Sequence, residues 1–324
     1  MLTIPVQVSG DRWNNPHQVQ QLLEQTRPGD SVMLDLCSEG PSLHRIGLVD
    51  MIAKYNLNVS ITQWSNAIES VPYQRVRCST SHFFSMSHHY WIDEIDNCVP
   101  AEFRFALFLG RGNPSRNRIL YDVYHQHGKN FLLSKMSCRS GDPWGVRYVE
   151  GNKLLETTEQ WFDNPEQAQN WFDQCPVASI DNHTVQDQFV IPEVSAGQMA
   201  RSLMQHYPRF NVELVCETYT LGETFFPTEK TIRPMVGNKP FVVYGPANYL
   251  NNLKQLGFRT FDDVWDESYD QYEGPQRWFS MRGLIDQLAQ ISSTQWTQIL
   301  QHCAQITQHN RSIVRKIIYD LKGI

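Results

Sequence analysis

Three signatures of common protein classes are missing from this sequence of 324 residues. No Cys-x-x-Cys pair occurs, which argues against a structural zinc site or a disulfide framework. No run approaches the roughly 18 apolar residues of a membrane span. No Gly-x-Gly-x-x-Gly follows an early strand, which argues against a dinucleotide enzyme such as a sugar epimerase. Seven cysteines are scattered along the chain, and we expect reduced thiols that fill the core at Cys37, Cys78, Cys98, Cys138, Cys175, Cys216 and Cys303.

Basic residues are fewer than acidic residues. The chain has 28 Lys and Arg against 34 Asp and Glu, a formal net charge of −6. This balance argues against broad, sequence-independent binding of nucleic acid, but it does not exclude a local basic groove. The first residues, MLTIPVQVSGDRW, lack the basic and apolar regions of a secretory signal. We therefore expect a cytoplasmic protein that does not insert into a membrane.

The residues that are present alternate between strand and helix patterns. Hydrophobic residues make up 41% of the chain and charged residues 19%, a globular composition. In the first third, an alternation of strands and helices predicts a doubly wound parallel sheet within residues 1–100. The expected strands are 4–9, 31–37, 58–65 and 82–91, and the expected helices are 15–30 and 42–56.

The alternation restarts near Pro100. Strands are predicted at 103–110, 129–137, 211–218 and 241–245, residues 259–264 close the alternation, and helices follow from Arg277. The predicted fold is α/β, with two Rossmann-like doubly wound lobes and C-terminal helices. The expected domains are residues 1–100, 101–275 and 276–324. Ligands of such a protein bind outside the carboxyl ends of the strands, in the cleft between lobes.

One short helix carries an unusual charge. Thr228 is a good N-cap residue, and Gly237 and Asn238 end the helix that it starts. Lys230 then lies in the first turn, where the helix dipole places partial positive charge. A bound diphosphate would resolve this conflict, because free backbone N–H groups at a helix start bind anions. The alternative is that Glu229 and Lys230 are solvated surface residues of an ordinary helix.

The stretch around this helix resembles a known family. The pattern Phe-x-Thr-Glu-Lys-Thr, followed by Gly-Asn-Lys-Pro-Phe-Val-Val-Tyr-Gly-Pro, is similar to the donor-binding region of GT-B glycosyltransferases, especially the fucosyltransferase-like group. The resemblance covers about residues 210–272, is weaker over 102–140, and extends to phage and bacterial proteins of that kind. It implies transfer of a sugar from a nucleotide sugar to an acceptor hydroxyl of a glycan, lipid, protein or modified DNA base.

The resemblance also implies roles for individual residues. Glu229 would hydrogen-bond the ribose of the donor nucleotide, and Lys230, in the turn between Thr228 and Thr231, would pair with its phosphate. A basic residue is expected after the first strand of the donor domain, where Arg111 is the first candidate and Arg116 and Arg118 follow. The alternative is that these three arginines form a solvated cluster. Glu217 ends a strand just before the donor loop, where it would orient Lys230, cap a turn or serve the structure alone.

Glycosyl transfer with inversion needs a general base from the N-terminal lobe. Glu39 is the candidate, because it follows the strand that ends near Cys37 and precedes a Gly-Pro turn. A role in loop structure is the alternative. Asp35 is expected to be structural, and His44 is a weaker base candidate.

No metal site is predicted. Asp93, Glu94 and Asp96 come closest to an Asp-x-Asp motif but are interpreted as a solvated acidic linker, and His82, His88 and His89 lack further ligands at metal-binding spacing. We therefore expect a metal-independent enzyme without a cofactor other than the donor.

The sequence leaves two alternatives open. The chain could be a phage-type glycosyltransferase that acts on hydroxymethylpyrimidine bases in DNA, or a non-catalytic protein that binds nucleotide sugars, since fold alone does not give activity.

Overall fold

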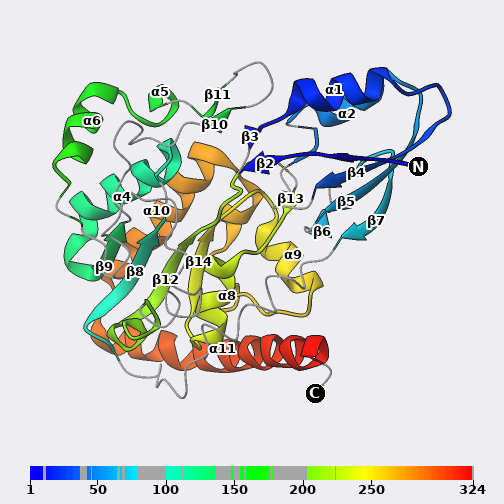
Figure 1. Cartoon of the computed structure of the whole chain (residues 1–324). Helices are drawn as coiled ribbons and strands as arrows, with labels where there is room; N and C mark the ends of the chain where they lie inside the picture. Colours follow the sequence, from blue (N-terminus) through cyan, green and yellow to red (C-terminus); the bar gives the residue numbers. More distant parts are fainter. Residues whose placement is uncertain are drawn as a thin grey trace.

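The fold was analysed in a computed structural model. It describes residues 1–9, 12–36, 42–44, 46–63, 66–67, 70–78, 100–110, 112–135, 147–148, 154–156, 158–175, 177, 203–222 and 224–322. Within these residues the protein is an α/β structure built on two four-stranded parallel sheets. One sheet comes from the first third of the chain and the other from the rest, and Figure 1 shows them at opposite sides of the molecule.

The first sheet has the strand order β1-β4-β5-β7. This order follows the chain without a reversal, so its described part is wound in one direction, and the expected double winding is not found here. The expected fourth strand, 82–91, lies outside the described residues, and the fourth strand of the sheet comes earlier. The strands are β1 (Leu2–Pro5), β4 (Ser31–Leu36), β5 (Asn58–Gln63) and β7 (Gln74–Cys78).

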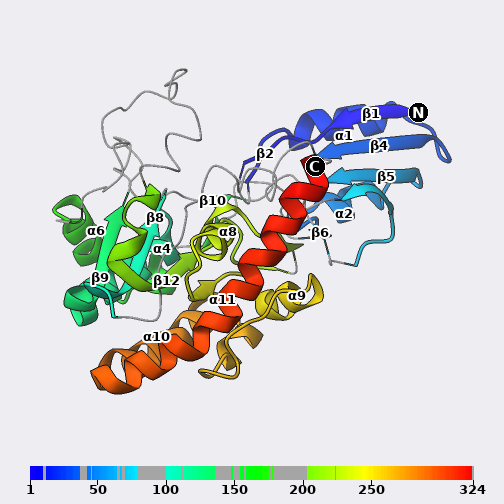
Figure 2. The same ribbon diagram turned by 90° about the horizontal axis from the view of Figure 1, so that it is seen from below.

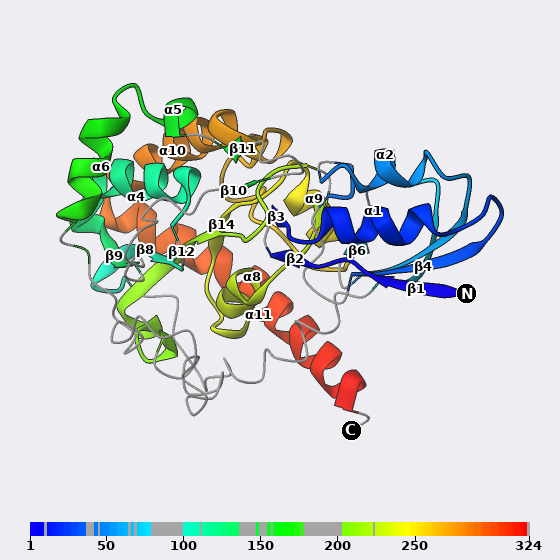
Figure 3. The same cartoon turned by 45° about the horizontal axis from the view of Figure 1, so that its top comes forward.

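Helices α1 (Pro16–Glu24) and α2 (Leu48–Ile52) cover one face of this sheet. Along β4, Val32, Leu34 and Leu36 are buried while the residues between them are not. The buried side chains form one hydrophobic cluster with residues of both helices. Right-handed crossovers that proceed in one direction place their helices on the same face, which explains this arrangement (Figures 1 and 3).

The second sheet has the order β14-β12-β8-β9. The order reverses between β8 and β12, so this sheet is doubly wound, as the sequence predicted, and it has a topological switch point there. All seven residues of β12 are buried, which is typical of a central parallel strand. The strands are β8 (Phe103–Leu109), β9 (Phe131–Lys135), β12 (Phe210–Cys216) and β14 (Phe241–Tyr244).

Helices cover both faces of the second sheet. The crossovers of α4 and α8 run in opposite directions from the switch point, which places these helices on opposite faces. Residues 259–264, which the sequence placed at the end of the alternation, form turns and no strand. The α-helices are α4 (Pro114–His127), α5 (Thr158–Trp161), α6 (Pro165–Asp173), α8 (Glu229–Val236), α9 (Tyr249–Gln255), α10 (Gly274–Gln290) and α11 (Ser293–Lys322), with short 3-10 helices at Gly128–Asn130, Tyr207–Arg209 and Ser268–Gln271.

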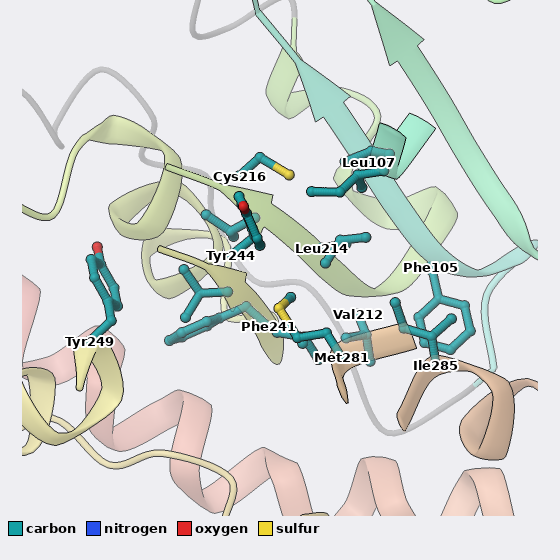
Figure 4. Packing of buried hydrophobic residues seen from close by; sticks show 14 of the residues in the cluster. Phe105, Leu107, Val212, Leu214, Cys216, Phe241, Tyr244, Tyr249, Met281 and Ile285 are labelled. Atoms are coloured by element: carbon teal, nitrogen blue, oxygen red, sulfur yellow. The ribbon is translucent and has the colours of Figure 1, made fainter. Parts of the chain in front are cut away.

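The main core lies between the second sheet and α10. Figure 4 shows Phe105 and Leu107 of β8 near residues of β12, with Met281 and Ile285 of α10 close by. Helix α11 continues from α10 and packs against α8 (Figure 2). Its buried residues extend to Val314 and Ile318, so most of its length belongs to the same core.

Within the described ranges, three short antiparallel ladders accompany the two sheets. One of them pairs β6 (Asn66–Ala67) with β13 (Thr224–Phe225) and so joins the first third of the chain to the loop that precedes α8. The other two are β2 (Val8–Ser9) with β3 (Arg12–Trp13), and β10 (Arg147–Tyr148) with β11 (Leu154–Glu156). Among the described residues, every helix is too short or too polar to cross a bilayer.

A half-buried carboxyl lies in the turn before α10. An oxygen of Glu267 accepts a hydrogen bond from the backbone N–H of Phe261 at 2.9 Å. Burial raises the pKa of Glu267 from 4.5 to about 7. The folded protein therefore holds this proton more tightly than the unfolded chain does. Its contribution to stability is present below pH 4.5 and is lost as the pH rises from 4.5 to about 7.

We predict that Glu267→Gln removes this pH dependence, because the carboxamide mimics the protonated acid at every pH. The free energy of unfolding of the variant, relative to the wild type, should increase by about 3 kcal/mol between pH 4.5 and pH 8. Urea denaturation at a series of pH values measures it. Asp263→Asn, at an exposed carboxyl on the same turn, is the control and should leave the slope unchanged. Parallel curves for wild type and Glu267→Gln would contradict the assignment.

Candidate functional site

The candidate site lies where the second sheet reverses its order. Ligands of open parallel sheets bind beyond the carboxyl ends of the strands that flank such a point. Strand β8 ends at Leu109 and leads through Gly110 and Gly112 to α4, while β12 ends at Cys216 and continues into Glu217 and Thr218. Helix α8 follows the loop after β12, so its first turn belongs to the same end of the sheet.

The first turn of α8 forms as the sequence predicted. Thr228 has extended backbone angles and its hydroxyl accepts a hydrogen bond from the N–H of Lys230 at 3.3 Å, so it is the N-cap. The helix runs over Glu229–Val236, and Gly237 is its C-cap. This confirms the predicted start and end of the helix.

A buried carboxylate holds this turn in place. Glu217 has no exposed surface, and its two oxygens accept five hydrogen bonds. Thr228 donates through its N–H at 3.1 Å and its hydroxyl at 2.5 Å, and the hydroxyl of Thr231 donates at 2.5 Å. The N–H of Thr218 and the hydroxyl of Tyr249 supply the other two, at 3.2 and 2.9 Å. Glu217 therefore fixes the start of α8 against the end of β12.

Tyr249 is the member of this group that the sequence analysis missed. It belongs to the first turn of α9, and its hydroxyl lies 2.8 Å from that of Thr231. Burial raises the pKa of Tyr249, and the charge of Glu217 raises it further, so the hydroxyl stays a donor. A Cβ at Gly245 would lie 2.9 Å from the ring of Tyr249. The sequence signal that could have pointed to Tyr249 is the Gly-Pro pair after β14, because only a glycine at 245 lets the ring pack so close to the backbone.

Lys230 does not extend into solvent. Its side chain is 15% exposed, and its Nζ lies 2.5 Å from an oxygen of Glu229, 3.1 Å from the hydroxyl of Thr218 and 3.4 Å from that of Thr228. Burial tends to raise the pKa of Glu229, but the charge and hydrogen bond of Lys230 outweigh it, and the pKa lies below its usual value. The cation at the positive end of the helix is thus balanced by the neighbouring carboxylate.

Most of the backbone donors of this turn also have partners within the chain. The N–H of Thr228 bonds to Glu217, and those of Thr231 and Ile232 both bond to the carbonyl of Thr228 at 3.2 Å. Since Lys230 donates its N–H to the N-cap, the expected free N–H groups are not found at these positions. An anion at this site would be held by the side chain of Lys230 and less by the backbone.

Two of the predicted arginines are engaged by the chain itself. Arg116 is buried, and its guanidinium donates to the carbonyls of Cys216 at 3.3 Å and Glu217 at 2.7 Å, which ties α4 to the end of β12. Arg118 forms an ion pair with Asp122 at 2.9 Å and also donates to the carbonyl of Trp161. Arg116 therefore lies at the switch point as a structural link, whereas Arg118 joins α4 to α5.

Several predicted residues lie outside the described part of the chain. They include the base candidate Glu39 and the phosphate-binding candidate Arg111, together with His82, His88, His89, Asp93, Glu94 and Asp96. Asp35, expected to be structural, accepts a hydrogen bond from Thr62, and His44 contacts the carbonyl of Ser70 at 3.0 Å.

The described residues contain no group of three or more His, Cys, Asp or Glu side chains that could hold a metal ion. Of the expected core cysteines, Cys216 and Cys303 are buried and unpaired with any other cysteine. Burial raises the pKa of Cys216 to about 12, so its thiol is not poised for nucleophilic chemistry. No protein-family model matches the chain, and comparison with curated proteins gives no match either.

We predict that Glu217→Gln destabilises the protein by about 2–4 kcal/mol, because an amide NH₂ would then face donors inside a buried network. Tyr249→Phe removes one of the five donors and should cost about 1 kcal/mol. Urea denaturation compares the two through the midpoint at unchanged slope. A midpoint for Glu217→Gln equal to that of the wild type would show that the neutral amide serves as well as the carboxylate.

Proposed function

We propose that the protein is a glycosyltransferase of GT-B type that transfers a sugar from a nucleotide sugar to an acceptor hydroxyl. The observation that carries the proposal is the Glu229–Lys230 pair, held at the carboxyl end of β12 beside the switch point. This is the place and the residue pair by which the sequence resembles the donor-binding region of that family.

The chemistry of the pair suits a nucleotide diphosphate. Departure of a nucleoside diphosphate leaves negative charge on phosphate oxygens, and a fixed ammonium group stabilises that charge. Lys230 is held by the hydroxyls of Thr218 and Thr228, so its position does not depend on Glu229 alone. On donor binding, Lys230 exchanges the carboxylate of Glu229 for the phosphate, and the carboxylate turns to the hydroxyls of the ribose.

The two parallel sheets support the two-lobed part of the proposal. The first third of the chain forms one sheet and the rest forms the other, as expected for an acceptor lobe and a donor lobe. The β6–β13 ladder joins the first third to the donor loop between β12 and α8. Closure of the lobes would therefore act directly on the loop that carries Glu229 and Lys230.

In this proposal the leaving group is stabilised by Lys230, without a resident metal, and Glu39 is the general base for an inverting reaction. The acceptor hydroxyl lies on a glycan, lipid, protein or modified DNA base.

We predict that Lys230→Ala weakens binding of a nucleoside diphosphate by about 10- to 100-fold, because a charge-assisted hydrogen bond is lost. Binding of the corresponding nucleoside should change by less than about twofold, since it has no phosphate. Isothermal titration with uridine and guanosine, each as nucleoside and diphosphate, measures both effects. Lys254→Ala is the matched control, because Lys254 forms an exposed ion pair with Asp262 at 2.8 Å outside the site.

An equal loss for nucleoside and diphosphate would refute the phosphate-binding role of Lys230. Catalysis is tested separately by incubating the wild type with a panel of nucleotide sugars and measuring the release of free sugar. Slow hydrolysis that Glu39→Gln abolishes, with donor binding intact, supports transfer. Donor binding without any hydrolysis or transfer would favour a non-catalytic nucleotide-sugar-binding protein.

A further inference from the structure

A second group of basic residues lies at the junction of α4, α5 and α10. Asp122 of α4 is buried and accepts hydrogen bonds from the indole N–H of Trp278 at 2.8 Å and from Arg118 at 2.9 Å. Arg282 of α10 reaches the same carboxylate at 3.4 Å. Two guanidinium groups thus share one carboxylate, which leaves a local excess of one positive charge.

Both guanidinium groups keep donors for an outside partner. The contacts of Arg118 with Asp122 and with the carbonyl of Trp161 use its Nε and one terminal nitrogen. Arg282 uses a single nitrogen, in one long contact, and its side chain is 30% exposed. Within the described part of the chain, their other nitrogens donate to no acceptor. Buried Asp122 and the carbonyl of Trp161 hold Arg118 in place, so an anion that binds it would cost little further side-chain entropy there.

An exposed aromatic ring lies beside both arginines. Phe279 is 45% exposed, and the guanidinium carbons of Arg118 and Arg282 lie 5.7 and 5.3 Å from its ring centre. Phe162 is buried and lies 5.4 Å from the guanidinium carbon of Arg118. The surface therefore offers charged donors for an oxyanion beside an apolar ring for the carbon skeleton that carries it.

We propose that Arg118, Arg282 and Phe279 form a binding site for a small organic oxyanion, a sugar phosphate or a sugar carboxylate. The phosphate or carboxylate accepts hydrogen bonds from the two arginines, and the sugar ring lies against Phe279. The site is separate from Glu229 and Lys230, because α4 and α8 lie on opposite faces of the second sheet. It therefore does not depend on the proposed function.

Isothermal titration of the full chain at low ionic strength tests the site, with glucose 6-phosphate and glucuronate as probes and glucose as the neutral control. We expect both anions to bind with dissociation constants at or below about 1 mM, and glucose not to bind. The tighter of the two anions identifies the preferred oxyanion. Inorganic phosphate should bind several-fold more weakly than glucose 6-phosphate, since it makes no contact with Phe279.

Variants then locate the binding. Arg282→Gln should weaken binding of the better anion at least tenfold, and Phe279→Ala about threefold. Arg315→Gln is the matched control, because Arg315 also lies beside an exposed ring, that of Tyr319, but on α11. Melting temperatures establish that each variant is folded.

Four results would overturn the proposal, and the first three concern the anions and the site itself. These three are no binding of either anion to the wild type, binding to Arg282→Gln as tight as to the wild type, and equal binding of phosphate and glucose 6-phosphate. Lys230→Ala should bind the anions as the wild type does. If it loses them, the anion binds at α8 and the site proposed here does not exist.

Discussion

The carboxylate of Glu217 is the constraint on which the candidate site depends. It is the first residue beyond β12, and burying a charge there is unfavourable unless hydrogen bonds replace its water. Five donors from four residues do so, and they come from the end of β12 and the first turns of α8 and α9. A network that is fully satisfied in this way admits one arrangement of its members. The position of Lys230 follows from it, because Thr228, which caps the helix and contacts the ammonium group, is held twice by Glu217.

A second buried carboxylate, that of Glu213, also fixes α8 against β12. Glu213 lies four residues before Glu217, so both side chains point to the same face of β12. Arg233 donates to Glu213 at 2.9 Å from within α8, and the hydroxyl of Tyr207 donates at 2.5 Å. Burial raises the pKa of Glu213, while the guanidinium opposes that effect. Helix α8 is therefore fixed to β12 near both of its ends by charged groups, which set its register more sharply than apolar packing alone.

Local sequence signals predicted those features that depend on neighbours in the chain. Thr228 and Gly237 bound α8 because capping is decided within a few residues. The apolar runs that became β8, β9, β12 and β14 were found because a buried parallel strand has a continuous signal. The single direction of winding in the first sheet could not be predicted, since it depends on which strands pair. The partners of Arg116 and the place of Tyr249 were missed for the same reason: both contacts join distant segments.

The charges at the start of α8 show a further limit of prediction from sequence: the cation was found, but its partner was not. The sequence placed a cation at the positive end of a helix, and an external anion was inferred to balance it. The balancing anion in the structure is Glu229. A ligand that binds Lys230 must take the place of the carboxylate of Glu229, and this restricts which ligands can bind here. A ligand that offers only an anion takes Lys230 and leaves a half-buried carboxylate without its partner, which is costly. A ligand that also carries hydroxyl groups can satisfy both members of the pair. Under the proposed function, the Glu229–Lys230 pair therefore favours a phosphate joined to a polyhydroxylated group over a simple anion, and a nucleoside diphosphate combines the two.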